Sequence, residues 1–389
     1  MILNGRGVWL VALGAVVCGL AAGCEETNPQ VLFSRCRYAE CEQVLRPQIP
    51  DAKHKDYALV SLQYSSAALE AGDLATAAGT IAKAEAAMNE IEGGGDTAAV
   101  VVAESLKTYR GDPYEKGMAH LYSGFLALQR EDHENALAAF RRALIADQDT
   151  RTENPDQKQD FVAAHYFAGL AYHLLDENEN AHVHLEQASR YTAPNAMLTL
   201  GAVSTANTFL LITSGYGPFK IASGPGGSIA AISKPPDPVT QVRLECDGSP
   251  LGDAAFLDDL LTQAAAQGLG EMDKIRIAKG VSKEVLAQVP YASLFSSAIH
   301  AEADVRVWSF LPGRLYVWAG RLEPGLHTLA LRCSGPDAGQ AAACDQVWFY
   351  VPVKAEKLNF LNFRLAPFRQ DVTDKVLVPV TALPEKKGK

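Results

Sequence analysis

The side chains that could carry out catalysis are few and scattered along the 389-residue sequence. No Gly-x-Ser-x-Gly, His-Glu-x-x-His or Gly-x-x-x-x-Gly-Lys-Ser/Thr motif occurs, so the common signatures of an activated serine, a catalytic zinc and a phosphate loop are missing. His182 and His184 are two residues apart, and on a helix they would point to different faces rather than toward one metal ion. We therefore expect no enzyme, no cofactor and no metal.

Acids and tryptophans form the next group of possible functional residues. Asp253, Asp258 and Asp259 fall at the start of a helical pattern over residues 252–268, where Asp253 would act as the N-cap. Three tryptophans lie on separate expected strands, and they would either pack in the core or form a stacking platform for a glycan. They are Trp308, Trp318 and Trp348. A hydrolase would need a buried cleft that joins acids with His300 or His327.

The cysteines are more informative. Cys333 ends an expected strand over 326–333 and Cys344 begins another over 344–353, so a hairpin would bring the two thiols face to face. A disulfide closing that loop would add about 3 kcal/mol of stability. Cys36 and Cys41, which flank a short segment, are the second candidate pair. With Cys246 these cysteines number five, so at least one stays outside any disulfide within the chain.

Composition sets the broad class. The chain is 48% hydrophobic and 21% charged, as ordinary globular proteins are, and its formal net charge is −10. An acidic chain of this kind argues against a nucleic-acid partner.

The first residues indicate export. Residues 8–20 form an apolar run that is too short to span a bilayer and is typical of a signal peptide. The run ends in Leu20-Ala21-Ala22-Gly23-Cys24, which resembles the lipobox of bacterial lipoproteins. That resemblance implies removal of residues 1–23 and lipidation of Cys24, and the lipid would hold the protein on a membrane. Glu25 favours the outer membrane, with the protein on its periplasmic face, while the inner membrane stays open. An ordinary secretory peptide is the alternative.

The N-terminal half is expected to be helical. Residues 24–51 are polar and predict a tether, and residues 52–195 are rich in alanine and leucine at helical spacing. Gly124, Ala136, Phe140 and Ala143 share their offsets with a second set, and a looser third set begins at Ser65. The second set is Gly169, Ala181, Leu185 and Ala188. The offsets resemble the tetratricopeptide repeat (TPR), with the polar stretch 147–160 as an inserted loop.

In the TPR family the inner helices line a concave face that holds a partner. The matching positions here are Leu121, Phe125, Leu128, Tyr166, Leu170 and His173. They predict an apolar groove for a peptide or partner helix. The alternative is that these residues are core beneath the C-terminal domain.

The C-terminal half changes character after Pro194. Expected strands are separated by Gly-Pro turns, and helical pieces are expected at 252–268 and 282–301. The expected strands cover 208–214, 239–246, 274–278, 304–310, 314–322, 326–333, 344–353 and 357–365. Residues 205–368 therefore predict an antiparallel β-sandwich-like domain with two helical insertions, and 369–389 a tail. The fold class is multidomain α+β.

Four stretches together resemble a family of uncharacterised bacterial lipoproteins that join TPR-like helices to a β-rich domain. They are residues 109–115, 215–220, 304–308 with 311–312, and 322–327. The family supplies a location and an architecture but no activity.

Interaction-type folds on a lipid anchor predict a non-catalytic adaptor or scaffold in the periplasm, with an envelope protein as partner. Envelope biogenesis, regulation of peptidoglycan synthesis and secretion assembly all fit this role. The alternative is a periplasmic glycan- or peptide-binding lipoprotein that uses the β-rich domain.

Overall fold

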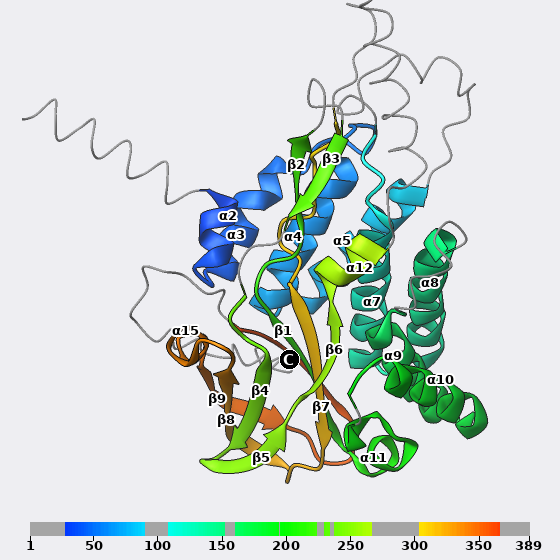
Figure 1. Cartoon of the computed structure of the whole chain (residues 1–389), viewed down its shortest axis with the longest axis vertical. Coiled ribbons are helices and arrows are strands. Elements are labelled where there is room, and N and C mark those ends of the chain that lie inside the picture. Colours follow the sequence, from blue (N-terminus) through cyan, green and yellow to red (C-terminus); the bar gives the residue numbers. More distant parts are fainter. Residues whose placement is uncertain are drawn as a thin grey trace, which may run out of the picture.

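The computed structural model describes residues 28–89, 108–151, 160–193, 195–223, 229–233, 237–266 and 303–365. Over these residues the N-terminal half is helical and the C-terminal half is rich in β-strands (Figure 1). Several expectations fall outside the described residues: the leader, Cys24, the strand at 274–278, the helix at 282–301 and the tail.

Three helix hairpins follow one another along the N-terminal half. They are α4 (Tyr57–Ala71) with α5 (Leu74–Asn89), α7 (Pro113–Gln129) with α8 (His133–Arg151), and α9 (Val162–Leu174) with α10 (Asn178–Arg190). One or two residues after the end of each first helix comes a residue with left-handed backbone, seven positions after the small residue that opens the sequence pattern. These residues are Gly72, Glu131 and Asp176, with φ of 82°, 61° and 62°. The recurring turn shows that the three hairpins share one repeating geometry.

Small residues let the two helices of each hairpin approach closely. A Cβ atom on Gly124 would lie 2.4 Å from the Phe140 ring, and one on Gly169 would lie 2.7 Å from Leu185. In the first hairpin Ser65 takes the glycine's place, and its hydroxyl donates a 2.9 Å hydrogen bond to the carbonyl of Ala77. The offsets read from the sequence therefore mark the true contacts between paired helices.

The expected tether is wrong over the residues that can be described. The segment contains α2 (Pro29–Ser34), α3 (Tyr38–Leu45) and the 3-10 turn η1 (Arg46–Gln48). Leu32, Phe33, Cys41 and Leu45 are fully buried against the first hairpin and the sheet. The few apolar side chains of this segment have the spacing of two short helices. The polar composition of the whole segment made this spacing hard to recognise in the sequence.

The C-terminal half contains two four-stranded sheets and a separate two-stranded hairpin. Sheet A has the order β10-β1-β7-β6, sheet C the order β5-β4-β8-β9, and β2 pairs with β3. Two short helical elements, η3 (Ala196–Leu198) and α11 (Leu200–Thr205), lead into the sheets. The strands are β1 (Thr208–Ser214), β2 (Phe219–Ser223), β3 (Ile229–Ser233), β4 (Gln241–Cys246), β5 (Ser249–Asp253), β6 (Ala255–Asp259), β7 (Arg314–Gly320), β8 (Gly325–Ser334), β9 (Gln346–Val353) and β10 (Asn359–Arg364), with α15 (Ala338–Ala342) between β8 and β9.

Sheet A lies between the helices and sheet C. On β1, Phe209 and Leu211 belong to the core shared with the helix hairpins, whereas Leu210 and Ile212 belong to the core shared with sheet C. Every residue of β1 is buried, and the apolar run at 209–212 forms its centre. The sandwich of two sheets is present, but one pair departs from the antiparallel expectation, since β1 and β10 run parallel.

Three local expectations in the second half of the chain differ from the structure. Residues 252–259 are mostly strand, and the helix there is only α12 (Leu260–Ala266), whose first turn is capped by Asp259 rather than Asp253. Residues 304–310 form no strand, because they run as an irregular segment across α4 and α7. The loop expected from 147 begins later, since α8 continues to Arg151.

Candidate functional site

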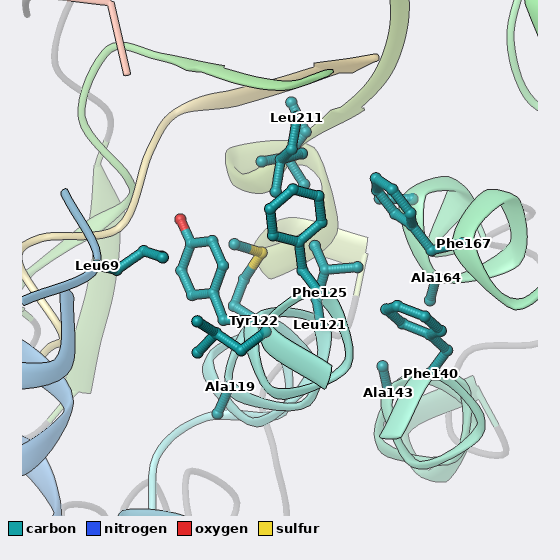
Figure 2. Close-up of a cluster of buried hydrophobic side chains, with 14 of the residues drawn as sticks. Leu69, Ala119, Leu121, Tyr122, Phe125, Phe140, Ala143, Ala164, Phe167 and Leu211 are labelled. Atoms are coloured by element: carbon teal, nitrogen blue, oxygen red, sulfur yellow. The ribbon is translucent and has the colours of Figure 1, made fainter. Parts of the chain in front are cut away.

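The predicted partner groove is filled by the chain itself. Leu121, Phe125, Leu128, Tyr166 and Leu170 are all 0% exposed. The Phe125 ring lies 5.6 Å from Phe167 of the next hairpin and 6.5 Å from Phe360 of β10. Figure 2 shows Phe125 pointing from α7 toward Leu211 of β1, with Phe140 and Phe167 beside it.

These five residues are therefore core beneath sheet A, and the open groove is wrong. The sixth predicted residue, His173, is half-buried near the end of α9, and its Nδ1 lies 2.7 Å from the Asn178 amide oxygen within its own hairpin. The helix pairing expected from the offsets is present, but other parts of the same chain cover the inner face.

A network of buried polar contacts connects the helices to the C-terminal half of the chain. Since the groove is filled, we describe this network as the candidate site. It begins at the N-terminus of α7, where Asp112 precedes Pro113 and the backbone N–H of Asp112 donates a 2.7 Å hydrogen bond to Glu115. A carboxylate at this position and a proline in the first turn are both favoured at helix starts. The sequence Gly-Asp-Pro-Tyr-Glu at 111–115 therefore fixes Glu115 locally before any long-range contact forms.

The second oxygen of Glu115 reaches the C-terminal half. It accepts a 2.6 Å hydrogen bond from the backbone N–H of Trp308, and the Trp308 indole donates a 2.9 Å bond to the Ser66 hydroxyl on α4. Trp308 also packs edge-on against Tyr122, with 6.0 Å between ring centroids. The segment around Trp308 is thus anchored to two different helix hairpins.

Lys220 of β2 completes this side of the network. Its ammonium lies 2.7 Å from the Asp112 carboxylate, and its side chain is only 7% exposed. Burial lowers the pKa of Lys220, but the charges of Asp112 and Glu115 more than offset that effect and raise it. Burial raises the pKa of Glu115, against the opposing charge of Lys220.

Arg306 forms a second branch. Its guanidinium makes 2.7 Å contacts with Asp304 and with Asp56, which precedes α4, and it lies over the Tyr109 ring at 5.6 Å. Stretches 109–115, 215–220 and 304–308, which carried the family resemblance, therefore meet at one place. The sequence offered this signal, but it could not show that the three stretches touch.

A third long-range contact lies nearby. The buried guanidinium of Arg364 on β10 donates to the carbonyls of Phe310 and Gly215 at 3.0 Å and lies over the Phe33 ring of α2. Arg364 therefore connects the 215–220 stretch and α2 to sheet A.

A small cavity lies between α7, α8 and α12. The cavity beside Tyr114 and Gly117 has a volume of about 10 Å³, about the space for one water molecule. Gln263, which lines this cavity, donates a 2.9 Å hydrogen bond to Asp258. Asp258 also accepts hydrogen bonds from the first two amides of α9, those of Val162 and Ala163, at 3.2 and 2.7 Å. Asp258 lies on β6, so a residue of a strand caps the N-terminus of α9. Burial raises the pKa of Asp258 to about 7. The arrangement can bind the two halves of the chain together.

The tryptophan platform is wrong. Trp308, Trp318 and Trp348 are 1%, 4% and 5% exposed, because the first packs under the helices and the other two lie in the core between the sheets.

The five described cysteines are thiols without a disulfide. Cys333 and Cys344 do flank the β8–β9 hairpin as expected, and both are buried. Cys41 donates to the carbonyl of Pro29 at 3.3 Å, while Cys36 contacts Tyr38. Both pairings remain predictions.

The two histidines do diverge on α10, as expected from their spacing. His182 is exposed, but the Nδ1 atom of His184 lies 2.9 Å from that of His165, which in turn contacts Asp160 at 3.2 Å. Burial lowers the pKa of His184 to about 4. A fully solvated face is therefore wrong for His184.

No protein-family model and no curated protein matches the chain. Two similar solved structures are described as "Crystal structure of MamA protein" and "Crystal structure of MamA", each 14% identical. The first match covers 43% of this chain and 75% of the other, with a TM-score of 0.28. The second covers 49% of this chain and 96% of the other, with a TM-score of 0.29. Since both scores are low, the fold description rests on the hairpins and sheets themselves.

Proposed function

We propose that this chain is a lipid-anchored cell-envelope protein and acts as a non-catalytic adaptor for a protein partner in the periplasm. The lipobox-like sequence ending at Cys24 supports the anchor and export. Envelope biogenesis, regulation of peptidoglycan synthesis and secretion assembly remain the processes it would serve. Among the described residues, no helix has the length and apolar character needed to cross a bilayer.

The observation that carries the adaptor role is the β2–β3 hairpin. Within the described residues it pairs with no strand of the two larger sheets. Phe219 and Ile221 alternate with Lys220 on β2, so they share the face opposite to it, and they are 38% and 49% exposed. Apolar side chains that stay exposed together mark interaction surfaces.

The Lys220–Asp112 ion pair connects one face of this hairpin to the residues at the start of α7. A two-stranded hairpin alone is marginally stable in water. With Lys220 fixed against α7 at 2.7 Å, the hairpin has a defined orientation, and its other face is held outward. We propose that this outward face, defined by Phe219 and Ile221, binds an apolar surface of the partner.

In-cell cross-linking, detergent extraction and mass spectrometry of the tagged protein test the proposal. We expect the wild type to recover one envelope complex and F219S/I221S to lose it. I145S/V183S is the matched control, because Ile145 and Val183 are 55% and 54% exposed on α8 and α10. Recovery of the same complex with F219S/I221S would overturn this surface, and a wild type recovered alone would overturn the adaptor role. A Cys24→Ser protein that stays tightly membrane-bound would refute the lipid anchor.

One observation favours the second candidate, peptide binding by the β-rich domain. On the edge strand β9, Phe349 and Tyr350 are 39% and 71% exposed. An edge strand with exposed aromatic side chains can accept an added strand. Peptide bound to the purified protein, and lost in F349S/Y350S, would favour this function instead.

A further inference from the structure

Three different metal-binding side chains converge at one end of sheet C. Cys246 is the last residue of β4, Asp247 begins the turn into β5, and His327 lies near the start of β8. One donor atom from each lies within 4.8 Å of the other two. The Asp247 carboxylate is 2.7 Å from His327 Nδ1 and 3.7 Å from Cys246 Sγ.

The turn chemistry of the chain produces this placement. Asp247 and Gly248 both have left-handed backbone, with φ of 50° and 80°, as an Asp-Gly pair adopts in a tight hairpin turn. Asp247 also exchanges two hydrogen bonds of 2.8 Å with Thr328: its N–H donates to the Thr328 carbonyl, and its Oδ1 accepts from the Thr328 N–H. Pairing of β4 with β8 therefore sets Asp247 directly beside His327.

The remaining polar atoms of these side chains are already held in place. His327 Nε2 lies 2.7 Å from the carbonyl oxygen of Glu323. Because a carbonyl only accepts, Nε2 carries a proton, and Nδ1 is the nitrogen that faces Asp247 and Cys246. In the same way Thr328 occupies Asp247 Oδ1 and leaves Oδ2 toward the cluster. Backbone partners that orient histidine and carboxylate ligands in this manner are typical of metal sites.

We propose that Cys246, Asp247 and His327 bind a divalent transition metal of the zinc class, with at least one coordination position open to solvent. Thiolate, imidazole and carboxylate together suit Zn²⁺ and not Mg²⁺ or Ca²⁺, which take oxygen ligands. Tetrahedral Zn²⁺ sets its ligand atoms roughly 3.5 Å apart, so the three donors need to move only about 1 Å. Binding displaces the thiol proton of Cys246 and the proton shared between His327 and Asp247, with no change of oxidation state.

The exposure of the three side chains to solvent also supports a metal site. Cys246 is 8% exposed, His327 is half-buried and Asp247 is exposed, so an ion can enter from solvent. Cys246 is also the thiol left over if the other four described cysteines form their two expected disulfides. The spacing rules missed this site because its ligands come from paired strands and not from one short motif.

Cobalt titration of the purified full-length protein tests the site. After chelator treatment, wild type should bind one equivalent of Co²⁺ with a thiolate-to-cobalt absorption band, and Zn²⁺ should abolish that band. C246S should lose the band, and D247N and H327Q should each weaken binding at least tenfold. The matched controls C344S and H173N, which alter another buried cysteine and another histidine, should bind as wild type does.

A band of unchanged intensity in C246S, or no band in wild type, would overturn the proposal. Thermal unfolding with and without Zn²⁺ provides a second readout that covers any variant that folds poorly. Zn²⁺ should raise the Tm of the wild type and of both controls more than that of D247N or H327Q. An equal rise in these two variants would also contradict the site.

Discussion

Glu115 accepts a 2.6 Å hydrogen bond from the backbone N–H of Trp308, a residue 193 positions further along the chain. The contact joins the second helix hairpin to the segment that leads into sheet A. Together with Lys220 and Arg364 it makes the helices and the sheet one unit with a shared core. The inner face of the hairpins is thereby closed, so the partner that we propose would bind elsewhere.

Replacing Lys220 with methionine should destabilise the protein by about 1–3 kcal/mol, because Glu115 and Asp112 would lose the cation that compensates their charge. The value lies between those of exposed and buried ion pairs, since the Asp112 side chain is 36% exposed. Lys357→Met is the matched control, since its ion pair with Glu131 is half exposed on both sides. An exposed pair of this kind contributes little to stability. Urea unfolding of the three proteins measures the difference, and equal losses in both variants would show that the Lys220 network is not a structural clamp.

Gly124→Ala should cost about 1–3 kcal/mol, because its Cβ would overlap the Phe140 ring, which is confined by its 5.6 Å stacking on Phe167. Gly79→Ala on α5 should instead stabilise by up to about 1 kcal/mol, since no atom lies within 4 Å of the added Cβ and alanine favours the helix. Opposite signs in urea unfolding are expected. A neutral Gly124→Ala would contradict the close approach of α7 and α8.

The pH dependence of stability should change in Glu70→Gln. Burial raises the pKa of Glu70 from 4.5 to about 7, against the nearby charge of Arg364. The folded state therefore holds this proton to a higher pH than the unfolded state does. The resulting stabilisation is complete below pH 4.5 and is lost as the pH rises to about 7.

The wild type should consequently lose more stability than Glu70→Gln between pH 4.5 and 7, as measured by the free energy of unfolding in urea. The variant keeps an acceptor for the 3.0 Å hydrogen bond from Asn362. Parallel pH profiles for the two proteins would show that Glu70 ionises normally.

If the chain is exported as we propose, a disulfide should form between Cys333 and Cys344. Both thiols are buried at the two ends of the β8–β9 connection, and Cys344 is near enough to raise the pKa of Cys333 beyond the effect of burial. Reduction or C333S/C344S should lower stability by about 3 kcal/mol. Non-reducing peptide mapping should find the linked pair, and two alkylated thiols in unreduced protein would refute it.

The sequence predicted those features that depend on short-range patterns. The strand predicted at 208–214 has the same bounds as β1. Its apolar run at 209–212 can be recognised from these residues alone, without knowledge of the strands that pair with it. The hairpin offsets of Gly124 and Gly169 were likewise correct. In each case the signal lies within one element or one turn.

Features that depend on distant segments could not be read in this way. Phe125 has the right position for an inner repeat face, but only the structure shows that Phe360 covers it. Residues 304–308 alternate like a strand, yet contacts with Glu115 and Ser66 hold them against helices. Cys246 and His327 are 81 positions apart, so only the pairing of β4 with β8 brings them together.

The most direct test of the account is in-cell photo-cross-linking from two positions of the same protein. A photoreactive phenylalanine would replace Phe219 on the outward face of β2, or Gln129 on α7, whose amide donates to the Phe360 carbonyl at 3.1 Å. We predict an adduct with another envelope protein from position 219 and only an internal cross-link to the β10 region from position 129. A partner captured from position 129, with none from position 219, would show that the repeat face is open and would contradict the account.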